Sequence, residues 1–296
     1  MNKNTILLSL SLLVLLLFII GCGSQSSSSS SLTKNYKTGY QGLVITTLEN
    51  YPPKTIYSSS NFVITVKLDN QGAYKLTNGK IEILGFNDKY IKLNQYKREI
   101  TSLTEANYLE GKSHTNPSGE FSYADFKATS KKLFKGSERY NAPYFIKGEY
   151  DYQTELTQTV CINSNPYEIN DAGCKVKPKK SLNGQGSPLA ITELEEIIQP
   201  GTIPQVEFRF KIKNQGSGKV KKVSLKRAKL GSDNLVCEFR NNPSTNKKLF
   251  IFKNKQDVTL ICKMVISSQK SYYTTLFLDF GFTYSLEVRK QITMVK

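Results

Sequence analysis

Two stretches of the sequence, FVITVKLDNQGA at Phe62–Ala73 and VEFRFKIKNQGS at Val206–Ser217, decide the fold. In both, apolar and polar residues alternate before an Asn-Gln-Gly sequence. Such alternation is typical of a strand with one buried face, and Asn-Gln-Gly is typical of a turn. The alternating apolar residues are Phe62, Ile64, Val66 and Leu68 in the first stretch, and Val206, Phe208, Phe210 and Ile212 in the second.

The likeness between the two halves extends beyond these stretches. ITTLE at Ile45–Glu49 recurs as ITELE at Ile191–Glu195, and another alternating run follows each Asn-Gln-Gly. The halves also end alike, since Tyr150–Leu156 resembles Phe280–Leu286. The second stretch starts 144 residues after the first (206 minus 62). That spacing is too long for a solenoid repeat and indicates a duplicated domain.

Short strands separated by Gly, Asn, Asp and Pro, without a persuasive helical period, predict an all-β protein of two β-sandwich domains in tandem. The segment 105–147 has few alternating apolar positions, so we expect much of it to be a long loop, a place where binding residues often lie. The expected boundaries are a signal peptide at 1–21, a lipidated cysteine and Ser-rich tether at 22–39, a first sandwich at 40–174, a basic linker at 175–188 and a second sandwich at 189–296.

The repeated pattern of an alternating strand, Asn-Gln-Gly and a second alternating strand carries a family resemblance. It resembles the immunoglobulin-like, CARDB-type adhesion domains of prokaryotic surface proteins. The stretch PPKTIYSSSNFVITVKLDNQGAYKLTNGKIEILGF at 52–86 is similar to predicted archaeal surface proteins. The resemblance implies an extracellular immunoglobulin-like sandwich fold, and that family has no shared catalytic residues to carry over.

The N-terminus has the parts of an export signal. Lys3 supplies a positive start, the run Ile6–Ile20 is apolar, and Gly21 is a small residue at the cleavage point. Ile19-Ile20-Gly21-Cys22 resembles a lipobox, which implies that Cys22 is acylated and becomes the mature N-terminus. The Ser-rich run up to Ser31 has nothing to bury and predicts a flexible tether. An uncleaved signal anchor is the alternative.

Cysteine arithmetic supports this interpretation. The chain has five cysteines, and an exported chain normally pairs them, so setting Cys22 aside leaves an even number. A bridge between Cys161 and Cys174 would close a small polar loop, and one between Cys237 and Cys262 would join two apolar, strand-like runs. Swapped pairing between the domains, and four free thiols, are the alternatives left open.

The chain is strongly basic, with 41 Lys and Arg against 24 Asp and Glu, a net charge of +17. Such a charge favours polyanions as partners, but only six of the cations are arginine, the residue that reads phosphates and base edges bidentately. Solvated lysine faces are the simpler interpretation. The candidate polyanion contacts are Lys131, Lys132 and Lys135 in the first half, and Lys221, Lys222 and Lys226 in the second.

No motif for catalysis, a metal or a cofactor is present. His114 is the only histidine and lies in a Gly/Asn/Pro-rich stretch, which predicts a solvated loop residue. Glu193, Glu195 and Glu196 are close together, and a solvated strand face explains them most simply. A carboxylate pair for glycoside cleavage would meet only in space, so the sequence does not decide that point.

The sequence therefore predicts a non-enzymatic protein anchored to the outer face of the cytoplasmic membrane, without cofactor or metal. Its expected work is adhesion, recognition or scaffolding at the cell envelope, with an envelope polymer or another surface protein as partner. A second hypothesis is capture of DNA or an acidic envelope polymer by the lysine-rich faces. A third is an enzyme that acts on polysaccharide.

Overall fold

The computed structural model describes residues 35–164, 173–240, 246–252, 257–267 and 270–296. The predicted signal peptide, Cys22 and most of the tether lie outside these residues. Within them the regular structure is β, apart from one turn of 3-10 helix, η1 (Ile100–Leu103). No helix in this part of the chain has the length and apolar character needed to cross a membrane.

The first half contributes a four-stranded antiparallel sheet in the order β1-β3-β7-β5. Of its two central strands, β3 contains most of the first alternating stretch, and Ile64, Val66 and Leu68 are fully buried on it. The strands are β1 (Leu43–Thr47), β3 (Asn61–Asn70), β7 (Phe121–Ser130) and β5 (Ile91–Leu93).

The second half contributes a five-stranded sheet in the order β14-β16-β11-β10-β9. The strands are β14 (Val236–Phe239), β16 (Val258–Val265), β11 (Gln205–Asn214), β10 (Leu189–Gln199) and β9 (Lys179–Ser181). Read as β10-β11-β16-β14, this order repeats β1-β3-β7-β5 of the first half. The shared order agrees with the predicted duplication.

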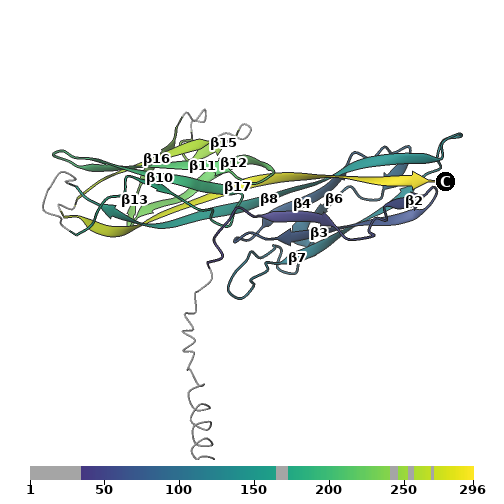
Figure 1. Ribbon diagram of the computed structural model, residues 1–296, viewed down its shortest axis with the longest axis horizontal. Coiled ribbons are helices and arrows are strands. Elements are labelled where there is room, and N and C mark those ends of the chain that lie inside the picture. Colours follow the sequence, from purple (N-terminus) through teal and green to yellow (C-terminus); the bar gives the residue numbers. More distant parts are fainter. Residues whose placement is uncertain (1–34, 165–172, 241–245, 253–256, 268–269) are drawn as a thin grey trace, which may run out of the picture. The chain divides into compact units, whose positions relative to one another are not determined.

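Both halves build a third, eight-stranded sheet, whose main path is β13-β12-β17-β8-β4-β6. Its centre is the antiparallel pair of two 24-residue strands, β8 (Arg139–Ile162) and β17 (Tyr272–Val295), which lie side by side along their whole length (Figure 1). The others are β4 (Thr77–Leu84), β6 (Lys97–Glu99), β12 (Lys219–Leu230), β13 (Asp233–Asn234), β15 (Leu249–Ile251) on β12, and β2 (Thr55–Tyr57) parallel to β17.

The inner face of this shared sheet packs on both smaller sheets. A Cβ on Gly148 of β8 would lie 2.7 Å from Cδ1 of Ile45 on β1. In the second half, the same inner face contacts the five-stranded sheet: the rings of Phe280 on β17 and Phe239 on β14 have centroids 6.3 Å apart. The buried apolar residues form one continuous cluster through both halves. The predicted fold class, an all-β protein built as sandwiches, is confirmed.

The same turn chemistry closes the strand of each alternating stretch. The Oδ1 atom of Asn70 accepts a bond from the backbone N–H of Gly72, and its Nδ2 donates to the carbonyl of Tyr74. Asn214 makes the equivalent bonds to residues 216 and 218. A tyrosine hydroxyl from a long strand supports each turn, Tyr152 in the first half and Tyr284 in the second.

The segment 175–188, predicted to be a linker, is part of the fold. It contains β9, and its polar residues Gln185 and Ser187 are buried. The Gln185 side chain donates a hydrogen bond to the carbonyl of Ile191 and accepts one from its backbone N–H. The Thr154 hydroxyl donates to the hydroxyl of Ser187. Composition missed this packing because a polar side chain can be buried when its hydrogen bonds are made inside the protein.

The segment 105–147, predicted to be largely loop, contains all of β7 and the start of β8. The buried positions of β7 include Ala124, Ala128 and Ser130, beside a single large residue, Phe126. Small residues give little apolar signal, so the period of two was not visible in the sequence. The segment also contains loop residues, among them Glu110–Ser113, which precede β7.

The two predicted disulfides are present. Cys161 is bonded to Cys174, and Cys237 is bonded to Cys262. The second bridge joins directly opposite residues of β14 and β16. Swapped pairing and free thiols are therefore both wrong. Paired cysteines fit an oxidising compartment.

Candidate functional site

The outer face of the shared sheet holds a polar groove of about 750 Å³. Its floor belongs to β8, β17 and β12, and its walls include Lys37, Tyr74 and the loop Glu110–Ser113. Both halves thus contribute residues, because β12 and β17 come from the second half and the remaining parts from the first. We define these residues as the shared-sheet groove.

Strand alternation explains why the floor of the groove is polar. Along β17 the even-numbered residues such as Phe280 and Phe282 face the core, so Gly281 and Thr283 face outward. Ser224 lies opposite Gly281 on β12 and donates a hydrogen bond to its carbonyl. A Cβ on Gly281 would lie 2.8 Å from Cε of Lys226, so the stem of Lys226 crosses the floor at this glycine.

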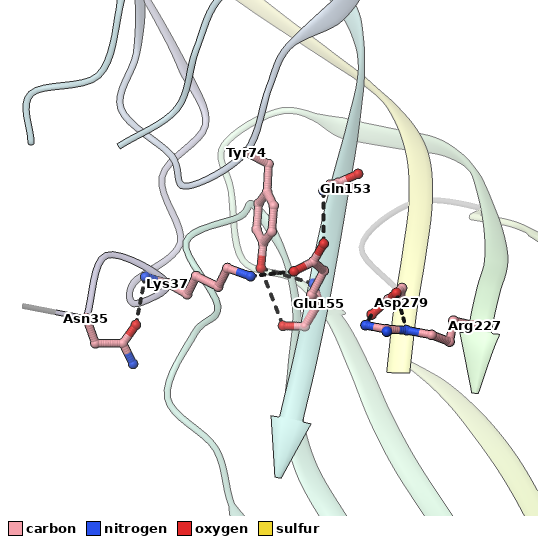
Figure 2. A network of polar contacts seen from close by, with 7 residues as sticks. All are labelled: Asn35, Lys37, Tyr74, Gln153, Glu155, Arg227 and Asp279. Atoms are coloured by element: carbon pink, nitrogen blue, oxygen red, sulfur yellow. Dashed lines mark hydrogen bonds and ion pairs between the residues drawn. The ribbon is translucent and has the colours of Figure 1, made fainter. Parts of the chain in front are cut away.

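Glu155 of β8 is the centre of a polar network at one end of the groove (Figure 2). Its carboxylate pairs with the ammonium group of Lys37 and accepts a bond from Nε2 of Gln153 at 3.1 Å. Its backbone N–H donates to the hydroxyl of Tyr74 at 3.1 Å. The network ties the segment before β1 and the end of the first turn to the shared sheet.

Tyr74 is a fixed hydrogen-bonding group. Burial raises the pKa of its hydroxyl well above the usual value of 10.0, against the opposing effect of the backbone bond from Glu155. The hydroxyl therefore stays protonated at neutral pH. Its ring is only 4% exposed, so the groove presents little aromatic surface at this position.

The other acidic side chains that line the groove are also held by partners. Asp279 accepts two bonds from the guanidinium of Arg227, with Nε–Oδ2 at 2.6 Å (Figure 2). Asp151 accepts bonds from the side chains of Asn78 and Thr283. Glu110 pairs with Lys75 at 3.0 Å. In each case a donor already bonds the carboxylate, and for Asp279 and Glu110 that donor is a cation.

Three lysines that line the groove lack such a partner. Lys112 in the wall, and Lys222 and Lys226 on β12, make no ion pair with any residue that the structure describes. The Lys112 backbone is fixed by its N–H bond to the carbonyl of Gly72. The free charge of the groove is therefore positive and comes from both halves.

The structure does not bring the six predicted lysine contacts together. Lys131, Lys132 and Lys135 lie in the connection from β7 to β8, beside the end of β17 at Val295. The second group lies on β12, which pairs with β17 only as far as Ser285. Ten residues of strand separate these positions, about 30 Å.

Within the second group, the three lysines also differ. Lys221 pairs with Glu149 of β8, whereas Lys222 and Lys226 line the groove without an acidic partner. Their outward direction could be predicted from strand alternation in the sequence. Lys112 and Lys37 were missed because nothing in a loop or terminal segment shows which sheet it covers.

A second hollow, of about 1070 Å³, lies beside the shared-sheet groove on the same sheet. It is lined by Lys147, Lys219 and Lys221, and by Ile251 and Phe252. These last two residues directly precede 253–256, which lie outside the described part. The shared-sheet groove, with fully described walls, is therefore the candidate site.

The remaining sequence candidates lie elsewhere. His114 is exposed and packs edge-on against the ring of Tyr36, with centroids 5.2 Å apart. Glu193 and Glu195 lie on an outer strand face, where they pair with Lys179 and Arg209. Glu196 is buried instead, which corrects the prediction of a solvated face. The described residues contain no cluster of three or more His, Cys, Asp or Glu suited to a metal ion.

Comparison with known proteins gives only distant structural likeness. No family model matches the chain, and no curated protein matches its sequence. The chain is similar to the E. coli chaperone DraB, with 8% identity over 79% of this chain and 86% of that one, at a TM-score of 0.20. A chaperone–tip adhesin complex of CFA/I fimbriae has 11% identity over 78% and 87%, at 0.18. The major capsid protein P2 of bacteriophage PM2 has 7% identity over 81% and 97%, at 0.16. Such low scores carry no argument about function.

Proposed function

We propose that this protein is a non-enzymatic recognition protein of the cell envelope, exported and anchored by a lipid on Cys22, which binds its target in the shared-sheet groove. The observation that carries the proposal is the groove itself, a polar hollow to which both halves contribute cations that have no acidic partner among the described residues. The two disulfides of the protein fit an extracellular position.

Binding is favoured over catalysis by how the acidic groups of the groove are held. Glu155, Asp151 and Asp279 each accept bonds from side-chain donors or cations, which stabilise the charged form and fix its direction. Groups held in this way suit a rigid recognition surface, because the side chains that would bond a ligand are already oriented before the ligand arrives.

The groove is tested by one variant in each half, with matched controls. Ser224→Trp places a ring over the floor, and Lys112→Glu reverses a charge in the wall. Thr259→Trp, half-buried on the outer face of the five-stranded sheet, and Lys131→Glu, in the β7–β8 connection, are the controls. Binding of the full chain to an isolated envelope fraction is measured by co-sedimentation. We expect both groove variants to weaken binding at least about tenfold and both controls to leave it unchanged.

Equal binding by all four folded variants would overturn the groove as the recognition site. The thermal midpoint of each variant shows whether it is folded, and Lys112→Glu, a substitution at a half-exposed loop position, keeps the test decisive if Ser224→Trp does not fold.

Anchoring and export are tested by the intact mass of the protein extracted from membranes. We expect a chain that starts at Cys22, carries the added mass of a lipid, and gains four hydrogens on reduction of its two disulfides. A mass that retains residues 1–21 would favour the signal-anchor alternative.

The second hypothesis, diffuse polyanion capture, makes a different prediction. If the lysine faces act only through their summed charge, Lys131→Glu should weaken binding to DNA as much as Lys112→Glu does, with a steep loss in salt. For the third hypothesis, hydrolysis of envelope polysaccharide should be detectable and should vanish in Asp151→Asn or Glu155→Gln.

A further inference from the structure

The charges of the shared-sheet groove do not cancel. Its acidic side chains have donors or cations beside them, whereas Lys112, Lys222 and Lys226 have no acidic partner among the described residues. Lys222 and Lys226 belong to the second half and Lys112 to the first. A ligand that lies along the groove therefore meets separate cations on two sides of a polar floor.

We propose that the shared-sheet groove binds a carboxylate-bearing polysaccharide. This inference rests on the proposed function and adds the chemical class of its target. The carboxylates of the polymer pair with the three lysines, whose compact and rotatable ammonium groups tolerate varied positions of a single charge.

The remaining polar groups of the groove match the hydroxyls of a sugar. Each carboxylate has about four acceptor positions. Glu155 uses two oxygens for Lys37 and Gln153, and Asp151 uses two for Asn78 and Thr283, so both retain lone pairs for sugar O–H groups. The hydroxyls of Ser113 and Ser224 line the same groove.

The same features disfavour nucleic acid in this groove. Proteins bind single strands by stacking bases on exposed aromatic rings, but Tyr74 and Tyr152 are each only 4% exposed here. Arg227, the one arginine beside the groove, has its guanidinium fork occupied by Asp279.

The test uses polygalacturonate as the probe, with neutral dextran and duplex DNA for comparison. The groove variant is Lys112→Gln/Lys222→Gln/Lys226→Gln in the full chain. The control is Lys131→Gln/Lys132→Gln/Lys135→Gln, which removes the same three charges from exposed positions that also lack acidic partners. Equal net charge in the two variants separates the groove from diffuse attraction.

We expect the wild type and the control to bind polygalacturonate alike, and the groove variant to bind at least about tenfold more weakly, with dextran unbound. Equal loss in both triple variants would overturn the inference in favour of net charge. DNA binding that is lost only in the groove variant, without polygalacturonate binding, would overturn it in favour of nucleic acid.

The experiments distinguish a wrong ligand class from a wrong binding site. If Ser224→Trp abolishes binding to the envelope fraction while polygalacturonate never binds, the groove is the site and only the ligand class is wrong. If neither the envelope fraction nor polygalacturonate distinguishes groove variants from their controls, both proposals are wrong.

Discussion

Asn70 and Asn214 show how single residues stabilise equivalent turns to different degrees. Asn70 is fully buried, and besides the bonds within its turn it donates to the carbonyl of Leu109 at 3.0 Å and accepts from the Tyr152 hydroxyl. Asn214 is half-buried, and its side chain bonds only within its own turn among the residues that the structure describes. A buried polar group left without a partner is costly, whereas water can replace a partner at the surface.

We therefore expect Asn70→Ala to lower the free energy of unfolding by about 2–4 kcal/mol and Asn214→Ala by about 1 kcal/mol. Urea denaturation of the full chain measures both. Asn94→Ala, at an exposed position, is the control and should stay within about 0.5 kcal/mol of the wild type. An effect at Asn214 as large as that at Asn70 would contradict this account of the turns.

Glu196 is a buried carboxyl group without a full set of partners. Its side chain is 5% exposed, and Oε1 has no hydrogen-bond partner among the described residues. Successive residues of a strand face opposite sides, so Glu195 and Glu196 could not both lie on one solvated face, and Glu196 shares the buried side with Leu194. Burial raises the pKa of Glu196 from its ordinary 4.5 to about 8.

This pKa makes stability depend on pH in a definite direction. Between about pH 4.5 and 8 the folded chain holds a proton on Glu196 that the unfolded chain has released. The stabilisation is complete below the unfolded pKa, and it is lost as pH rises, by at most about 1.4 kcal/mol per pH unit.

Glu196→Gln should remove this dependence, because the amide resembles the protonated acid. We expect the variant to match the wild type near pH 4.5 and to exceed its free energy of unfolding by several kcal/mol at pH 8.5. Glu195→Gln, at an outward-facing position, is the control. Wild type and Glu196→Gln with parallel pH profiles would mean that the carboxyl is not protonated in the folded chain.

At the scale of elements, the bridge between β14 and β16 secures a short edge strand. β14 has four residues and, among the described strands, pairs only with β16, and its Val236 is 79% exposed. The bridge closes a sequence separation of 25 residues, for which loop closure predicts about 3 kcal/mol of stabilisation.

The variant Cys237→Ala/Cys262→Ala should therefore unfold about 3 kcal/mol more easily, measured by denaturant titration without reductant. Cys161→Ala/Cys174→Ala, which removes a bridge of separation 13, should lose slightly less. An unchanged midpoint in the first variant would show that pairing in the sheet alone holds β14.

Elements with large alternating residues could be predicted from the sequence, and those without them could not. β3 and β11 bury Ile64, Val66, Phe208 and Phe210, which stand out against polar neighbours. β7 buries mainly Ala and Ser, and its role in the sheet depends on pairing with β3, a long-range contact that no local pattern records.

The candidate site divides in the same way. The outward direction of Lys222 and Lys226 follows from alternation within one strand. The wall residues Lys37 and Lys112 are brought to that strand only by the folding of two loops over the shared sheet. Local patterns describe a face of a strand, whereas a groove needs the arrangement of several segments.

At the scale of the whole molecule, the two halves are not independent domains on a linker. β8 and β17 pair over 24 residues, and the apolar core runs through both halves. Separating the halves would expose the edges of both long strands. The sequence indicated a duplication, but not that the last strands of the two halves pair with each other.

We therefore expect residues 35–296 to unfold in one cooperative transition, although the chain is long enough for two domains. Differential scanning calorimetry of the full protein should give a calorimetric enthalpy equal to the van't Hoff enthalpy. Two separable transitions, one for each half, would contradict a shared sheet that couples them.

The central claim is that one groove, built by both halves, is the recognition site. Hydrogen–deuterium exchange of the full protein, with and without polysaccharide isolated from the envelope of the cells that make it, tests this most directly. We predict that the ligand slows exchange together at Glu110–Ser113 of the first half and at Lys222–Lys226 of the second. Protection confined to one half, or to the β7–β8 connection around Lys131–Lys135, would contradict the account.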